Sequence, residues 1–294
     1  MFYTYVYTVI DLPHKIINKL IRITQNSSHF TRDRNKSDSQ VTFYEKSVNE
    51  IISSQGAFKR FRRKYNYREI LEHLTYHDGK RYLDYLNLNY PEWKSRLSQF
   101  VLNDRIGSPR TFKFQGIGPV SPTTLRYIAV AHDIEKLFGF EKISNVVEIG
   151  GGYGGQFSVL QNFKKFSTYQ IFDLPEVQEL ISRFINELGV EQAKFPLYPP
   201  KNFENESIDL VISNYAFSEL PREVQEIYLE SICKFAKNGF FLMNSGLNNY
   251  SGRSKGKLKL EEIREKIPNL RIAPENPSTG PDNYLLYWVE NPNA

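Results

Sequence analysis

Hydrophobic residues recur with two different periods along this chain, and the change falls near residue 144. Before that point, apolar side chains return every three or four residues with charges between them. This spacing predicts amphipathic helices, which we place at 41–54, 67–77 and 80–102. Scattered glycines and prolines predict a loop over 106–121, and a further helix begins at Pro122 after Ser121 and ends at Gly139.

After residue 144, short apolar runs alternate with helical patterns. The runs predict strands at 145–150, 168–173, 193–197, 208–214, 239–244, 270–273 and 284–290. The helical patterns cover 175–189, 221–236 and 259–267. Such alternation is typical of a parallel sheet covered on both faces. We therefore predict a Rossmann-like, doubly wound α/β fold with seven strands, mostly parallel, whose last two strands form a hairpin and an antiparallel edge.

The same change of pattern predicts two regions. Residues 1–115 would form a helical region that covers the substrate, with a polar loop over 25–40. Residues 116–294 would form the α/β domain.

A glycine-rich segment follows the first predicted strand, where residues 148–157 read EIGGGYGGQF. Glycines permit a tight turn and let a ligand approach bare backbone, and the helix that begins near Gly155 directs free N–H groups toward that ligand. Asp173 ends the next strand, 23 residues after Gly150. A carboxylate there can accept hydrogen bonds from both ribose hydroxyls. The pattern predicts a nucleoside-bearing cofactor at the carboxyl ends of the strands.

The identity of that cofactor depends on Glu148. Gly150, Gly152 and Gly155 also satisfy the dinucleotide pattern G-x-G-x-x-G, so NAD is an alternative. A buried carboxylate at Glu148 would repel a pyrophosphate, whereas it could receive an ammonium group. S-adenosyl-L-methionine carries an ammonium and a sulfonium but no phosphate. We therefore expect S-adenosyl-L-methionine.

Three segments resemble the first, second and fourth motifs of class I methyltransferases: VVEIGGGYGGQF, YQIFDLPEV and DLVISNYAFSELPRE. Together with YREILEH and IGSPRTFKFQGIGPVSPTTLRY, they make the chain similar to the bacterial sugar O-methyltransferases over about residues 45–290. The resemblance implies a methyltransferase sheet, a methionine site at Glu148 and the glycines, and a ribose site at Asp173. Residues 193–197 read AKFPL and lack the acid that relatives often place near the adenine.

The expected cofactor-binding residues are those of the glycine segment and of the turns after the second and fourth strands. They are Glu148, Gly150, Gly151, Gly152, Tyr153, Gly154, Gln156, Asp173, Leu174, Asn214 and Tyr215.

Candidate catalytic groups follow the fourth strand. Methyl transfer is an in-line displacement, so an enzyme must align a nucleophile and remove its proton. Relatives carry a histidine base near the position of Ser218, and this chain does not. We expect Glu219 to be the base, because shielding by its apolar neighbours would raise its pKa. The alternative is a purely structural acid near the start of a helix.

Other candidates lie on the predicted helix 122–139 and after the fifth strand. His132 is a reserve base. Arg126, Tyr127 and Asn244 are expected to bind substrate, and Arg126 could pair with a substrate phosphate or carboxylate or with a helix neighbour. His73 and His77 have helical metal-ligand spacing but no third ligand, so we expect no metal.

Positive charge is concentrated in the first part of the chain. Residues 1–110 hold 19 Lys and Arg against 11 Asp and Glu, and residues 111–294 hold 19 against 22. The excess peaks at 59–64, where Phe58, Phe61 and Tyr65 recur as on one helix face. This run is either a solvated face or a surface that attracts a nucleotide-linked sugar, acidic lipid or nucleic acid. Nucleic acid ranks last because no recognition motif accompanies the run.

Composition excludes several classes of protein. The single cysteine, Cys233, excludes a disulfide framework. No apolar run approaches a membrane span, and the first ten residues lack a basic leader, so we expect a cytoplasmic protein. Peripheral membrane contact and a homodimer both stay open.

The leading hypothesis is an S-adenosyl-L-methionine-dependent O-methyltransferase that acts on a sugar hydroxyl in surface polysaccharide or glycosylated metabolite biosynthesis. Its substrate would be a sugar or a nucleotide- or lipid-linked glycan. A second hypothesis replaces the sugar by a phenol, a carboxylate or a phosphorus-bearing group. A third is a non-catalytic module that binds the nucleoside and a partner, and a dehydrogenase ranks last.

Overall fold

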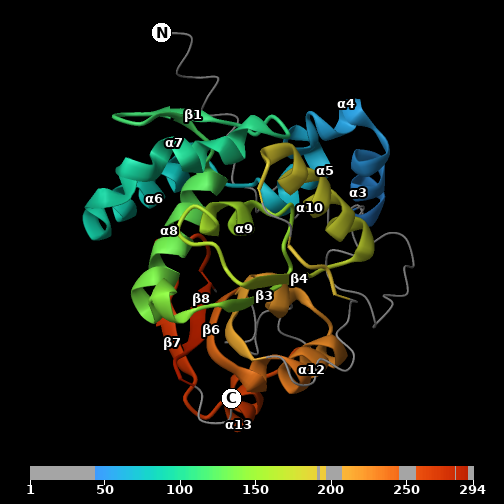
Figure 1. Cartoon of the computed structure of the whole chain (residues 1–294), viewed down its shortest axis with the longest axis vertical. Helices are drawn as coiled ribbons and strands as arrows, with labels where there is room; N and C mark the ends of the chain where they lie inside the picture. Colours follow the sequence, from blue (N-terminus) through green and yellow to red (C-terminus); the bar gives the residue numbers. More distant parts are fainter. Residues whose placement is uncertain (1–43, 191–192, 197–206, 245–255, 282, 291–294) are drawn as a thin grey trace. The chain divides into compact units, whose positions relative to one another are not determined.

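A six-stranded sheet forms the centre of the α/β region (Figure 1). Its strands are β3 (Asn145–Ile149), β4 (Thr168–Phe172), β5 (Ile208–Asn214), β6 (Ala236–Met243), β7 (Arg271–Pro274) and β8 (Tyr284–Trp288). They lie in the order β4-β3-β5-β6-β8-β7. Strands β4, β3, β5 and β6 are parallel, and β8 is antiparallel to both of its neighbours. The predicted Rossmann-like, doubly wound α/β fold is confirmed.

These observations come from a computed structural model that describes residues 44–190, 193–196, 207–244, 256–281 and 283–290. The predicted loop at 25–40 lies outside the described residues. Residues 35–294 form one compact unit. The division into a covering region up to residue 115 and a domain after it stays a prediction.

One detail of the predicted sheet is corrected and another is confirmed. Of the strand predicted at 193–197, the described residues 193–196 do not form a strand, because Lys194 makes only a single parallel bridge to Gln170. Pro196 has no N–H with which to extend that ladder. The predicted hairpin at one edge of the sheet is confirmed: β7 is the outermost strand, and β8 lies next to it and is antiparallel to both of its neighbours. The inner place goes to the more apolar strand, whose Trp288 is fully buried.

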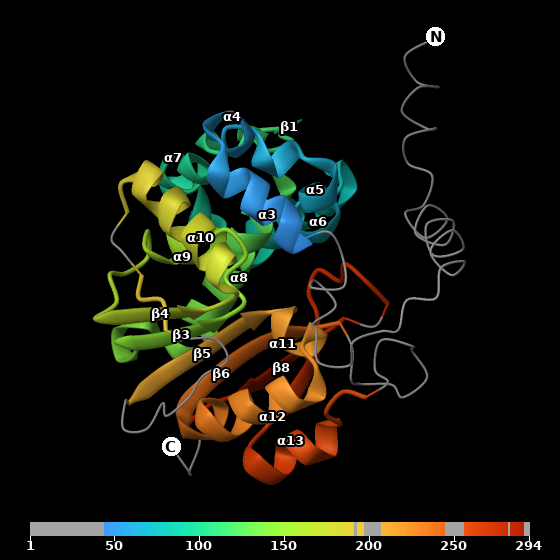
Figure 2. The same cartoon turned by 90° about the vertical axis from the view of Figure 1, so that its right-hand side faces the viewer.

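Helices cover both faces of the sheet (Figure 2). One layer contains α8 (Pro122–Phe138), α9 (Gly155–Leu160) and α10 (Pro175–Leu188), and the other contains α11 (Ala216–Glu219), α12 (Arg222–Ser231) and α13 (Leu260–Lys266). Alternate residues of β3 point into the two layers, so Val146 belongs to one buried cluster and Val147 to the other. Cys233 is buried in the second cluster and has a packing role.

Helix α8 begins and ends where the sequence predicts. Ser121 caps it, since its side chain accepts a hydrogen bond from the Thr124 N–H at 3.1 Å. Gly139 follows its last residue with a positive φ of 66°.

The region before α8 is helical but more divided than predicted. It contains α3 (Tyr44–Ser53), α4 (Gln55–Phe58), α5 (Tyr65–Leu71), α6 (Tyr76–Asn89) and α7 (Leu97–Phe100), with 3₁₀ turns at Phe61–Arg63, Pro91–Arg96 and Val101–Arg105. Two local signals divide it: Thr75 and Asp78 form a capping box that starts α6, and Pro91 follows its end. The predicted loop 106–121 contains a small hairpin, β1 (Phe112–Phe114) and β2 (Gly118–Val120).

The basic run 59–64 does not lie on one helix. Arg62 is fully buried, where it forms ion pairs with Glu72 and Asp104 and lies over the Tyr153 ring. Tyr65, predicted to share a face with Phe58 and Phe61, is 52% exposed. Arg62 is therefore a structural ion-pair partner and takes no part in a charged surface.

One hydrophobic cluster joins the first region to the α/β region. It contains Phe61 and Trp93 together with Ile128 of α8 and Phe184 of α10. Helix α3 packs on α10. In the described part of the chain, none of the helices combines the length and apolar character that a membrane span requires.

Candidate cofactor and acceptor site

The glycine segment forms a tight turn between β3 and α9. Gly150, Gly152 and Gly154 have φ values of 80°, 61° and 88°, a region that favours glycine. A Cβ at Gly150 would lie 2.1 Å from the Ala216 Cβ, so this glycine lets the turn after β5 approach. A Cβ at Gly152 would meet only Leu71 of α5, at 3.4 Å. Helix α5 therefore lies over the bare backbone of the turn.

Asp173 lies against this turn, as predicted. Its Oδ2 accepts a hydrogen bond from the Gly152 N–H at 3.3 Å, and its Oδ1 accepts one from the Leu174 N–H at 2.8 Å. Burial raises the pKa of Asp173 to about 7, although the N–H groups of Leu174, Gly152 and Gly151 oppose that rise. The structure therefore joins the glycine turn and the acid at the ends of adjacent parallel strands.

Glu148 lies on β3 immediately before the turn and is only 1% exposed. Its Oε2 accepts a hydrogen bond from the Tyr169 hydroxyl at 2.8 Å. Burial raises the pKa of Glu148 to about 8, against the stabilising hydrogen bond from Tyr169 and with a smaller contribution from the charge of Asp173. Burial therefore favours the protonated form of this carboxyl.

Of the other predicted cofactor residues, Tyr153 is fully buried and has its ring against Phe184 and Arg62. Gln156 links two elements: its Nε2 donates to the Tyr127 carbonyl at 3.2 Å, and its Oε1 accepts from Asn214 Nδ2 at 3.3 Å. Gly151 and Gly154 pack under Ile181 of α10.

The candidate catalytic groups after β5 meet the end of β6. Ser218 Oγ lies 2.7 Å from the Tyr215 carbonyl oxygen and 2.9 Å from Asn244 Oδ1. Asn244 Nδ2 donates to Glu219 Oε1 at 2.8 Å. The structure thus brings Ser218, Glu219 and Asn244 into one hydrogen-bonded group at the carboxyl edge of the sheet.

Tyr215 connects that group to the β7–β8 segment. Its φ of 69° lies in the region that favours glycine, a conformation that costs roughly 1–3 kcal/mol and is common at functional sites. Its hydroxyl donates to Glu275, a buried carboxylate that also accepts from the Thr279 N–H at 2.6 Å and Asn283 Nδ2 at 3.0 Å. This network holds the Tyr215 ring in place.

Arg126 and Tyr127 lie on α8, beside Tyr215. Arg126 is 4% exposed, and its guanidinium carbon lies 5.5 Å from the centre of the Tyr127 ring and 5.6 Å from that of Tyr215. Its Nε has no hydrogen-bond partner in the described residues. The Tyr127 ring packs against Gly155.

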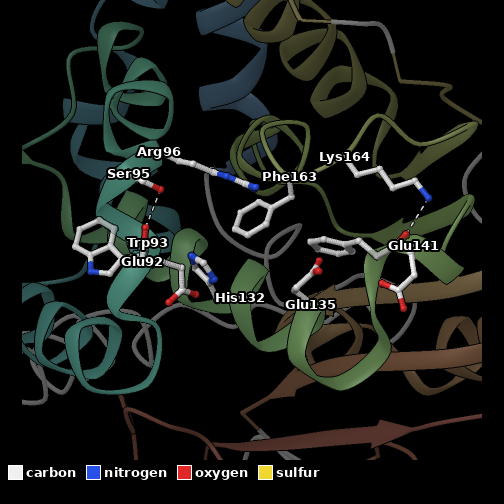
Figure 3. A pocket seen from close by; sticks show the side chains of 10 residues that line it. Glu92, Trp93, Ser95, Arg96, His132, Glu135, Glu141, Phe163 and Lys164 are labelled. Carbon is white, nitrogen blue, oxygen red and sulfur yellow. Dashed lines mark hydrogen bonds between the residues drawn. The ribbon is translucent and has the colours of Figure 1, made fainter.

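His132 lies elsewhere. It stacks on Tyr90 and meets the edge of Phe163, with ring centres 4.8 Å apart in both pairs. With Arg96, Phe163 and Lys164 it lines a cavity of about 470 Å³ (Figure 3). Burial lowers the pKa of His132 to about 4. None of the other predicted site residues lines this cavity, so the structure does not bring His132 together with them.

Sequence reasoning missed three groups near the site. Leu71 covers Gly152, Tyr44 of α3 lies within electrostatic range of Asp173, and Glu275 orients Tyr215. No local motif marks them, since each reaches the site through long-range packing. Among the residues that the structure describes, no three His, Cys, Asp or Glu side chains gather as metal ligands do.

Comparison with known proteins gives matches to solved structures at low sequence identity. No protein-family model matches the chain, and no curated protein does. The mitomycin 7-O-methyltransferase MmcR is 16% identical, with a TM-score of 0.38 over 56% of this chain and 56% of that one. An O-methyltransferase family protein from Burkholderia thailandensis is 16% identical, with a TM-score of 0.42 over 72% of each chain.

A SAM-dependent methyltransferase from Aquifex aeolicus is 16% identical, with a TM-score of 0.39 over 54% of this chain and 88% of that one. The match to MmcR spans about half of the length of that protein. The Rossmann-like α/β fold itself follows from the strand order and the two helix layers.

Proposed function

We propose that the protein is an S-adenosyl-L-methionine-dependent O-methyltransferase. The observation that carries the proposal is the hydrogen bond between the Asp173 carboxylate and the Gly152 N–H, which joins the glycine turn after β3 to the acid after β4. In open α/β sheets, ligands bind beyond the carboxyl ends of the strands. A carboxylate at this position suits ribose hydroxyls, and the turn offers bare backbone.

The residues present fit this cofactor. Gly152 exposes bare backbone between Leu71 and the turn, and Asp173 is positioned to accept hydrogen bonds from a ribose. Asn214 Oδ1 is buried without a hydrogen-bond partner in the described residues, so it is available to an ammonium group. The bound cofactor would supply a methyl group on a positively charged sulfur.

The protein's own residues would align the acceptor and take its proton. Glu219 is the proposed base, and Asn244 holds its carboxylate by the hydrogen bond to Oε1. Ser218, buried beside them, fixes the Asn244 side chain. A base held in this way would act on a hydroxyl placed in line with the sulfonium carbon.

We propose a sugar hydroxyl as the acceptor on the resemblance of the sequence motifs. A phenol, a carboxylate or a phosphorus-bearing group is the alternative, and a screen of methyl transfer to these acceptor classes separates them. The sugar would be free or part of a nucleotide- or lipid-linked glycan.

Titration calorimetry with S-adenosylhomocysteine tests the cofactor assignment. We expect wild-type protein to bind in the micromolar range. Replacing Asp173 by Asn or Ala should weaken binding about 100-fold, the loss expected when hydrogen bonds to a charged group disappear. Glu179→Gln, which neutralises an exposed carboxylate on α10, is the control and should bind normally. Unchanged affinity in both Asp173 variants would contradict the proposal.

A further inference from the structure

The two deeply buried arginines of the described chain have opposite surroundings. Arg62 is surrounded by acceptors: it pairs with Glu72 and Asp104, and its Nη1 donates to the Asn103 carbonyl at 2.7 Å. Arg126 is buried nearly as deeply, at 4%, yet no carboxylate of the described residues lies within ion-pair distance of it. An arginine stays protonated in proteins, so Arg126 is a buried positive charge with no ion-pair partner among the described residues, although the Glu72 carboxylate acts on it from a longer distance.

The surroundings of Arg126 are aromatic. The rings of Tyr127 and Tyr215 flank its guanidinium, as given above. Tyr82 of α6 lies within electrostatic range. Burial raises the pKa of Tyr82, and the positive charge of Arg126 opposes that rise. Aromatic faces attract a cation, but they do not supply the hydrogen-bond acceptors that its N–H groups require. Arg126 Nε consequently has no hydrogen-bond partner in the part of the chain that the structure describes.

The position of Arg126 separates it from the proposed nucleoside site. Asp173 follows β4, on one side of β3, whereas Tyr215 follows β5, on the other side. Tyr215 is in turn bound to Glu275 at the end of the β7 edge. Arg126 thus faces the half of the sheet that carries the proposed base Glu219 and its partner Asn244. A cofactor whose nucleoside lies at the ends of β3 and β4 and whose ammonium group reaches Asn214 leaves the side of β6, with Glu219 and Asn244, for the acceptor.

We propose that Arg126 binds an anionic group of the acceptor, a carboxylate or a phosphate, so that the acceptor is an acidic molecule. The proposal rests on the proposed function and adds the charge of the substrate to it. A buried unpaired charge is unfavourable, and an oxyanion that fills its hydrogen bonds removes that penalty. The planar guanidinium matches the two oxygens of a carboxylate or phosphate. The flanking tyrosine rings would exclude water from the contact and thereby strengthen it.

Calorimetry with three small probes tests the proposal: inorganic phosphate, D-glucuronate and, as the neutral counterpart, D-glucose. Each is titrated at constant ionic strength into the full chain, with and without saturating S-adenosylhomocysteine. The variants are Arg126→Met, Arg126→Lys and the control Lys136→Gln, which removes an exposed charge from the same helix. We expect wild-type protein and the control to bind at least one anion more tightly than glucose. Arg126→Met should lose roughly 10- to 100-fold in that affinity, the range expected for a hydrogen-bonded charge pair, and Arg126→Lys should retain part of it.

Three results would overturn the assignment. The first is wild-type protein that binds neither anion more tightly than glucose, and the second is Arg126→Met that binds them like wild type. The third is a tenfold loss of S-adenosylhomocysteine affinity in Arg126→Met, which would assign the arginine to the cofactor's carboxylate. Thermal unfolding without ligand is the structural readout: loss of an unpaired charge should leave the melting temperature unchanged or raised. The anions are also titrated without S-adenosylhomocysteine, so the two proposals can fail separately. If wild-type protein does not bind S-adenosylhomocysteine, the proposed function is rejected, and the anion titrations still test the role of Arg126.

Discussion

Replacement of Glu148 by Gln should change how the stability of the protein depends on pH. Glu148 is 1% exposed, and its pKa is raised from 4.5 to about 8. A carboxyl whose pKa is raised by folding contributes its full stability below the unfolded pKa, and that contribution is lost as the pH rises through the folded pKa. The protein without ligand should therefore become less stable as the pH rises from about 5 to 9.

The magnitude follows from the size of the shift. One pKa unit corresponds to about 1.4 kcal/mol, so the Glu148 carboxyl should reduce the free energy of unfolding by about 4 kcal/mol between pH 5 and pH 9. Asp173 acts in the same direction, because its pKa is raised from 3.8 to about 7. Glu148→Gln keeps the shape of the side chain and cannot ionise, so it should remove the Glu148 part of the slope and retain the Asp173 part.

The assay is urea denaturation followed by circular dichroism at several pH values, for wild type, Glu148→Gln and Glu179→Gln. Glu179 is exposed and serves as a matched control that should keep the wild-type slope. Equal slopes for wild type and Glu148→Gln would refute the reasoning. Ligand binding gives a second readout: if Glu148 ionises to receive the cofactor's ammonium, S-adenosylhomocysteine binding at pH 7 should release a proton in wild type, and the variant should release less.

Two further predictions concern the turn and the base. Gly150→Ala should abolish S-adenosylhomocysteine binding and strongly destabilise the fold, because the new Cβ would lie 2.1 Å from Ala216 Cβ. Gly189 has a similar φ of 67° but no atom within 4 Å of the position of a Cβ, so Gly189→Ala should lower the free energy of unfolding by only about 1 kcal/mol. Equal unfolding midpoints for the two variants would contradict this. Glu219→Gln should lower the methyl-transfer rate roughly 100- to 10,000-fold with the acceptor found in the screen, and leave S-adenosylhomocysteine affinity unchanged. The exposed Glu223→Gln is its control, and a normal rate in Glu219→Gln would assign Glu219 a structural role.

The parts of the fold that depend on neighbours in sequence were predictable. The helix over 122–138, its capping serine and the central strands all carry local signals of period and punctuation. The glycine turn and Asp173 were predictable for the same reason, because a few consecutive residues are enough to indicate a tight turn or the end of a strand. Thr75 and Pro91 also carry local signals, for the start of a helix and for its end. The predicted boundaries did not use them, and the structure has more and shorter helices there than predicted.

The roles of individual charges could not be predicted in this way. Arg62 and Arg126 are both arginines in helical patterns, yet only the folded chain brings Glu72 and Asp104 to the first and tyrosine rings to the second. The sequence by itself determined the order of strands and helices and the position of the glycine turn. The tertiary structure decided which side chains are buried and what partners they have. The physical reason is that the free energy of a charged side chain depends on its burial and on its ion-pair partners. Contacts between residues far apart in the chain determine both of these.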